Sequence, residues 1–167
     1  MSQLFVDTIT EKTSGSGVVI PDHVLQTIHN TFTDNTTTST DQTYVDASGS
    51  SVTITTKQAN SKIYLQAMLQ IYAQSSCNGC YMAFKRGGTL IAGVNGTLGD
   101  SWRHLNGASE TSNSFMMTRQ YLDAPAVAAG TSLTYNIGIS RWTSGTVEIN
   151  YSGYNMDSYF LVQEIAQ

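Results

Sequence analysis

One stretch of the sequence alternates apolar and polar side chains so regularly that it limits the fold to a β class. Ile63, Leu65, Ala67, Leu69, Ile71 and Ala73 alternate with Tyr64, Gln66, Met68, Gln70, Tyr72 and Gln74. Because successive side chains of a strand point to opposite faces, this pattern predicts a long, half-buried strand. No segment of the chain combines a sustained helical period with capping residues, so we expect no substantial helix.

Shorter stretches repeat the pattern between turn residues. Further strands are expected at 24–33, 44–46, 52–56, 81–85, 89–92, 114–122 and 159–165, separated by Ser48-Gly49, Asn78-Gly79, Gly87-Gly88, Asn95-Gly96, Asn106-Gly107 and Gly153. Residues 133–140 and 147–151 flank Ser144-Gly145, which predicts a hairpin. Only 12% of the residues are charged, which suits polar-faced strands better than helices. The fold class predicted is all-β, an antiparallel jelly-roll sandwich.

The chain divides into a short arm and a head. Residues 1–22 hold two small strand candidates without a core of their own, so we expect an extended arm that must dock on other protein surface. Its apolar anchors are Phe5, Val6, Ile9, Val18 and Ile20. Residues 23–167 form the head, in which the polar segment 34–41 is expected to be a linking loop.

Charge and hydropathy exclude two classes of partner. A net charge of −4 with 8 Lys and Arg residues gives no basic footprint, so nucleic acid is not expected to bind. No stretch approaches the ~18 apolar residues of a membrane span, and the first residues show no leader pattern, so synthesis in a cytoplasm without membrane insertion is expected.

Catalytic patterns are absent from the sequence. No Gly-x-Ser-x-Gly elbow occurs, and the acids Asp100, Glu110, Asp123 and Glu148 have no spacing that singles out a pair for glycoside cleavage. We therefore expect a protein that is not an enzyme and carries no cofactor.

Cys77 and Cys80 flank Asn78-Gly79, which places them at the ends of an expected hairpin turn rather than before a helix. The pair indicates free thiols in a reducing cytoplasm, or a turn disulfide formed later. A metal site would need two more ligands from distant histidines, so none is expected.

Two surface features are candidates for binding. Tyr64, Met68 and Tyr72 share the outward side of the long strand, where they form either a subunit interface or a patch covered by another layer. The loop around Trp102, Arg103, His104 and Asn106 gathers an indole, a guanidinium, an imidazole and an amide that could hold a sugar, and Trp142 at an expected hairpin tip is a weaker candidate. Packing of Trp102 against the sandwich is the alternative for this loop.

Several short motifs occur in the order found in one family of proteins. They are residues 5–18 (FVDTITEKTSGSGV), 61–63 (SKI), 84–89 (FKRGGT), 121–125 (YLDAP), 145–150 (GTVEIN) and 162–165 (VQEI). In this order the chain resembles small virion surface or tail-fibre proteins from phages of cyanobacteria and other aquatic bacteria. The resemblance spans nearly the whole chain and departs from the family at residues 77–80 and 102–113.

The resemblance implies a jelly roll like that of tumour necrosis factor or complement heads, a homotrimer, and a place in a virion assembled in the host cytoplasm. The expected function is a tail-fibre component that presents its head to a host surface glycan or protein, with the arm bound to other virion proteins. The alternatives are a capsid decoration protein and, less favoured, a depolymerase of surface glycans.

Overall fold

A computed structural model describes residues 22–40, 43–74, 77, 79–92, 101–102, 112–142, 144–153 and 157–167. The strands are β1 (Val24–Phe32), β2 (Thr36–Thr38), β3 (Val45–Asp46), β4 (Val52–Thr55), β5 (Lys62–Ala73), β6 (Cys80–Arg86), β7 (Thr89–Ala92), β8 (Ser101–Trp102), β9 (Asn113–Asp123), β10 (Ser132–Arg141), β11 (Val147–Ile149) and β12 (Ser158–Ile165). In these residues the secondary structure is all β, and they contain no helix long and apolar enough to span a membrane.

The strands form two antiparallel six-stranded sheets. The first sheet has the order β1-β12-β5-β11-β2, with β9 on the other side of β5, and the second has the order β3-β10-β6-β7, with β4 beside β10 and β8 beside β6. Early strands pair with late strands in a nested series: β1 with β12, β2 with β11, β4 with β10, β5 with β9, and β6 with β7. This nesting is the jelly-roll arrangement, so the predicted fold class is confirmed.

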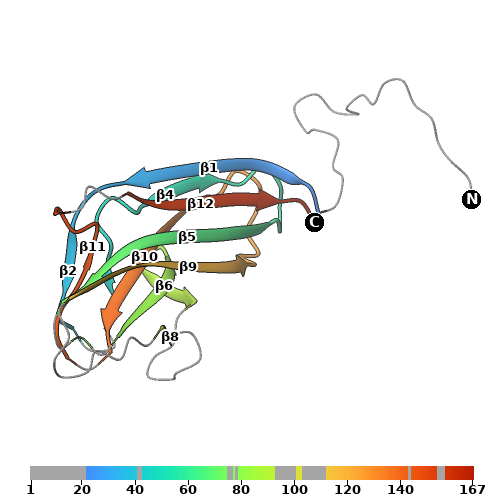
Figure 1. Cartoon of the computed structure of the whole chain (residues 1–167). Helices are drawn as coiled ribbons and strands as arrows, with labels where there is room; N and C mark the ends of the chain where they lie inside the picture. Colours follow the sequence, from blue (N-terminus) through green and yellow to red (C-terminus); the bar gives the residue numbers. More distant parts are fainter. Residues whose placement is uncertain are drawn as a thin grey trace, which may run out of the picture.

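The long alternating segment forms the centre of the first sheet, as predicted. Its aliphatic side chains, among them Ile63, Leu65 and Leu69, are fully buried against the second sheet. The ring pair Phe84 and Phe160, with centroids 5.6 Å apart, joins β6 of one sheet to β12 of the other across this core. Figure 1 shows β1, β12, β5 and β9 side by side as one layer.

The hairpin predicted around Ser144-Gly145 is wrong. β10 belongs to the second sheet and β11 to the first, so the chain crosses between the sheets here instead of turning back on itself. The crossing packs against the connection from β5 to β6: Gln74 donates its backbone N–H to the carbonyl of Thr146 at 3.0 Å. A Cβ on Gly145, whose φ is +75°, would come within 2.5 Å of the Cys77 nitrogen, so only glycine fits.

Two other expectations about connections also fail. The polar segment 34–41 contains β2, because Thr36 and Thr38 are buried and the strand pairs with β11. The connection from β5 to β6 is not the hairpin expected around Cys77 and Cys80, because these two strands lie in different sheets. Period-two patterns identify strands without telling which sheet each strand joins. The turn predicted at Gly87-Gly88 is confirmed: it connects the paired strands β6 and β7 with φ values of +55° and +80°.

The described chain begins and ends at the same end of the sandwich. Asp22 donates its N–H to the carbonyl of Ala166 at 3.1 Å, and Ala166 donates to the carbonyl of His23 at 2.9 Å. The C-terminus accordingly lies beside the start of β1 (Figure 1). The arm anchors Phe5, Val6, Ile9, Val18 and Ile20 lie outside the described residues.

Candidate functional site

The three residues expected at a subunit interface lie on one side of β5. Tyr64, Met68 and Tyr72 point away from the core, and each is half-buried by its neighbours in the sheet. The sequence pattern therefore placed them on the correct face, while their role in a subunit contact stays a prediction.

The strand register extends this face across four strands. Its rows are Thr27, Gln163, Tyr64 and Leu122; then His29, Leu161, Gln66 and Gln120; then Thr31, Tyr159, Met68 and Thr118; and last Gln70 and Met116. None of these residues is Asp, Glu, Lys or Arg, and we refer to the set as the uncharged face. Lys62, which lies on the same side of β5 two residues before Tyr64 and pairs with Ile165, borders this face. Two of its large apolar side chains are open to solvent, with Met116 56% and Leu122 47% exposed.

The outer side of the second sheet has a different character. There Lys85 forms an ion pair with Asp46, with 2.5 Å between Nζ and Oδ1. Asn136 donates from Nδ2 to the other carboxylate oxygen of Asp46 at 3.1 Å. A charged and hydrogen-bonded outer surface of this kind suits contact with water, whereas depletion of charge is typical of the buried centre of an interface.

Several side chains interact at the end of β5 that carries Tyr72. The ring of Tyr72 stacks on that of Tyr151, with centroids 4.2 Å apart and planes 12° from parallel. The adjacent carboxylate of Glu148 is buried and accepts hydrogen bonds from Gln74 at 2.5 Å and from Asn35 at 3.3 Å. Tyr72 therefore already has an intramolecular partner, Tyr151, and Tyr151 in turn lines a hollow.

This hollow has a volume of about 480 Å³ and lies where three segments of the chain meet. Its lining residues are Thr33, Asp34, Asn35, Asn150, Tyr151, Ser152 and Asp157. No local sequence pattern indicates it, because residues 33–35 are distant in the chain from residues 150–152 and 157. The available signal was an accumulation of Asp, Asn, Ser and Thr directly after or before expected strands.

The structure describes only part of the predicted sugar-binding loop. The backbone of β8 pairs Trp102 with Cys80, and Cys80 pairs on its other side with Arg141, so Trp102 and Trp142 come to the same end of the second sheet. Trp142 packs on Tyr81 with ring centroids 5.4 Å apart. The side chain of Trp102, and Arg103, His104 and Asn106 as a whole, lie outside the described residues.

Both cysteines are buried as free thiols. Burial raises the pKa of Cys80, and the neighbouring Cys77 raises it further. Burial also raises the pKa of Cys77, although a backbone hydrogen bond from Gly79 and the positive charge of Arg141 oppose this effect. Thiols of this kind are poor nucleophiles at neutral pH. Within the described ranges, no three His, Cys, Asp or Glu side chains gather as a metal site would require.

Two buried carboxylates at the other end of the sandwich hold the fold. Asp123 accepts hydrogen bonds from Arg86 at 2.6 Å and from the Tyr135 hydroxyl at 2.8 Å, which joins the two sheets. Burial and the hydrogen bond to Asp123 raise the pKa of Tyr135. Glu164 accepts from two backbone N–H groups, a hydroxyl and an amide. Both printed donors to Asp123 meet its Oδ2 atom, and both oxygens of Glu164 accept from donors that belong to the fold.

Comparison with known proteins identifies no family. No family model matches the chain. No curated protein matches it either.

Several solved structures are similar at low identity. Dimeric latent PorU from Porphyromonas gingivalis aligns with 92% of this chain at 14% identity and a TM-score of 0.44, and the infectious bursal disease virus VP2 subviral particle aligns with 97% at 14% identity and 0.39. Eiger TNF from S. frugiperda aligns with 84% at 10% identity and 0.33, and the match covers 94% of that protein. The chain spans only 14% of PorU and 42% of VP2. The fold assignment therefore rests on the strand pairing described above.

Proposed function

We propose that this chain is a structural subunit of a phage particle, a homotrimeric tail-fibre component whose head faces the host. The observation that carries the proposal is the uncharged face on β1, β12, β5 and β9. A surface without charged groups can meet an identical copy of itself without like-charge repulsion, and burial of Met116 and Leu122 would favour that contact. The threefold symmetry and the place in a phage particle come from the resemblance of the sequence motifs.

The position of the chain ends supports this arrangement. Residues 22 and 23 are held beside Ala166, so the arm leaves the head at one end of β1. The nine residues of β1 span about 30 Å, and they separate that end from the loops around Thr33 and Tyr151. A head anchored by its arm would therefore present these loops outward.

Sedimentation of the full chain with charge-introducing variants tests the assembly. Wild type is expected at three times the 18.1 kDa of one chain. Met116→Asp and Leu122→Asp should dissociate it while the fold is retained, because both side chains are exposed in the single chain. Thr89→Asp on β7 of the second sheet is the matched control and should leave the mass unchanged.

The sedimentation mass separates three outcomes. A wild-type chain that sediments as a monomer at micromolar concentration, or variants that retain the full mass, would contradict assembly through this face. A stable dimer would keep the face and remove the threefold symmetry. Symmetry-resolved electron cryomicroscopy of virions then separates the two sites on the particle: density at fibre tips supports the tail-fibre role, and density on the capsid supports the decoration role instead.

A further inference from the structure

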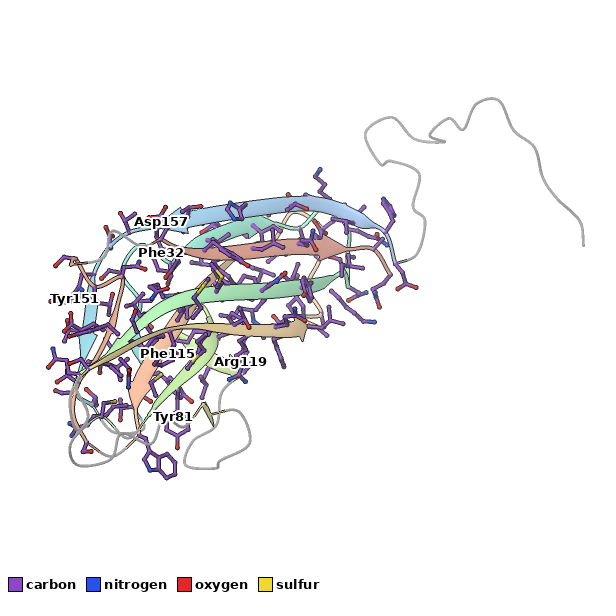
Figure 2. All side chains as sticks on the ribbon, in the orientation of Figure 1. Phe32, Tyr81, Phe115, Arg119, Tyr151 and Asp157 are labelled. Carbon is purple, nitrogen blue, oxygen red and sulfur yellow. The ribbon has the colours of Figure 1, made fainter. Side chains whose placement is uncertain are left out.

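The hollow beside Tyr151 lies at the end of the sandwich that faces away from Asp22 and the C-terminus (Figure 1). Figure 2, drawn in the orientation of Figure 1, shows Tyr151 and Asp157 at that end, far from the C-terminus. Thr33 follows the last residue of β1, and Asp157 precedes the first residue of β12, so the long strands fix both walls. Loops carried on a rigid sandwich are where binding residues concentrate.

A buried asparagine makes the base of the hollow rigid. Asn150 is 3% exposed and has a φ of +52°. Its side-chain amide donates to the carbonyls of Phe32 at 2.9 Å and Asp34 at 3.3 Å, and its side-chain oxygen accepts from Ser158 at 2.6 Å. These bonds fix the segments around the hollow before any ligand arrives, which reduces the entropy that a ligand must overcome.

The rim above this base offers hydrogen-bonding groups to solvent. Asp34, Asp157, Ser152 and Thr33 are exposed. Within the described part of the chain, no donor bonds to the carboxylate of Asp34 or Asp157. Carboxylates accept and hydroxyls both donate and accept, so the rim matches a molecule with several hydroxyl groups. A volume of about 480 Å³ lies in the range of small-molecule sites.

Charge narrows the class of ligand. Among the described residues, the lining includes two carboxylates and no Lys, Arg or His, so a phosphate or a sugar acid would be repelled. A bare Ca²⁺ ion takes about 6–8 oxygen ligands, whereas the described residues contain no group of three acidic or other metal-ligating side chains. The structure assigns this hollow to a neutral sugar, a hexose or N-acetylhexosamine unit of a surface glycan. The inference rests on the proposed function for the source of the glycan, and on the lining chemistry for its class.

Saturation-transfer difference NMR on the full chain tests the assignment. The neutral probes are mannobiose, cellobiose and N,N′-diacetylchitobiose, and the anionic probes are sialyllactose and inorganic phosphate. Transfer to at least one neutral sugar and none to the anionic probes is expected. Asp157→Ala should weaken the binding about ten-fold or more, since it removes a charged acceptor. Ser152→Trp should abolish it by filling the hollow.

Asp22→Asn, at an exposed turn beside the C-terminus, is the control and should bind as wild type does. Failure of all neutral probes, equal transfer to sialyllactose, or undiminished transfer in both hollow variants would overturn the assignment. Calorimetry with calcium chloride alone tests the alternative of a cation site. Binding to the wild-type chain that is absent from Asp157→Ala would overturn the sugar assignment. Sedimentation of the same samples keeps the two proposals apart, because a monomer that binds sugar contradicts only the assembly, and a trimer that binds none contradicts only this inference.

Discussion

Glu164 shows how one side chain can organise a whole corner of this sandwich. Its carboxylate has no exposed surface and accepts from the N–H groups of Lys57 and Gln58, the Ser61 hydroxyl and the Gln26 amide, at distances from 2.5 to 3.1 Å. Lys57, Gln58 and Ser61 hold the connection between β4 and β5 against β12, and Gln26 adds β1 to the same contact. No cation is needed, because each carboxylate lone pair meets a donor.

Replacement of this carboxylate should therefore be costly. Glu164→Ala leaves two partly buried backbone N–H groups and the buried Ser61 hydroxyl without this acceptor, so we expect a loss of about 3 kcal/mol in the free energy of unfolding. Glu164→Gln keeps the shape but turns an NH₂ group toward donors, with a loss of about 2 kcal/mol. Urea unfolding at pH 7 measures both. Asp22→Asn, an exposed carboxyl, is the control, and a Glu164→Gln variant as stable as the control would refute this account.

The same carboxylate makes stability depend on pH. Burial alone would raise the pKa of Glu164, but the hydrogen bonds outweigh burial and hold its pKa below the ordinary value of 4.5. The unfolded chain therefore binds the proton more tightly, and the stabilisation is fully present above pH 4.5 and declines as pH falls through the lower, folded pKa. The stability difference between wild type and Glu164→Gln should shrink across that acidic range in urea titrations. A difference that stays constant down to the acid transition would contradict the lowered pKa.

The two cysteine thiols should be unreactive in the folded protein. Cys77 and Cys80 are buried, and burial raises the pKa of each. Iodoacetamide at pH 7.5 should leave both unmodified in the folded protein and alkylate both in 6 M guanidinium chloride, because the thiolate is the reactive form. Mass spectrometry of the intact chain counts the adducts. Fast labelling of either thiol under native conditions would show that this connection opens readily.

Asn150 holds the ends of several strands together. It follows β11, and its amide bonds reach the end of β1, the segment before β2 and the start of β12. Asn150→Gly removes these bonds while suiting the φ of +52°, and should cost about 2 kcal/mol. Asn150→Ala also places a Cβ in the left-handed region, which adds about 1 kcal/mol. Equal stabilities of the two variants in urea unfolding would rule out the backbone contribution.

Some strands could be predicted from the sequence, and others could not. β5 could be placed because Ile63, Leu65 and Ala67 alternate with polar residues over a long run. β2 could not, because its inward side chains are Thr36 and Thr38, which are buried without being apolar. The pairing of β11 also escaped prediction: Val147 and Ile149 have the same alternation as β10 but fill the core from the opposite sheet.

At the scale of the whole molecule, the sequence indicated a face but not a hollow. Tyr64 and Met68 share a strand, so their common side follows from spacing alone. The rest of the uncharged face, from His29 to Gln120, depends on pairing between strands that are far apart in the chain. The hollow depends on the meeting of residues 33–35 with residues 150–152 and 157, for which no local pattern exists.

Residues 1–21 should contribute little to the stability of the head. The buried core runs from Phe32 to Ala166, and the first described contacts of the chain are those of Asp22 and His23 with Ala166. Deletion of residues 1–21 should therefore shift the melting temperature by less than about 2 °C and preserve the sedimentation mass, while attachment to virions is lost. Deletion of residues 1–26 is the contrasting variant. It removes the start of β1 and the Gln26 bond to Glu164, so the melting temperature should fall by several times that amount. If the shorter deletion lowers the mass, the arm contributes to self-assembly; if virions still take up the shortened head, the head itself provides the attachment.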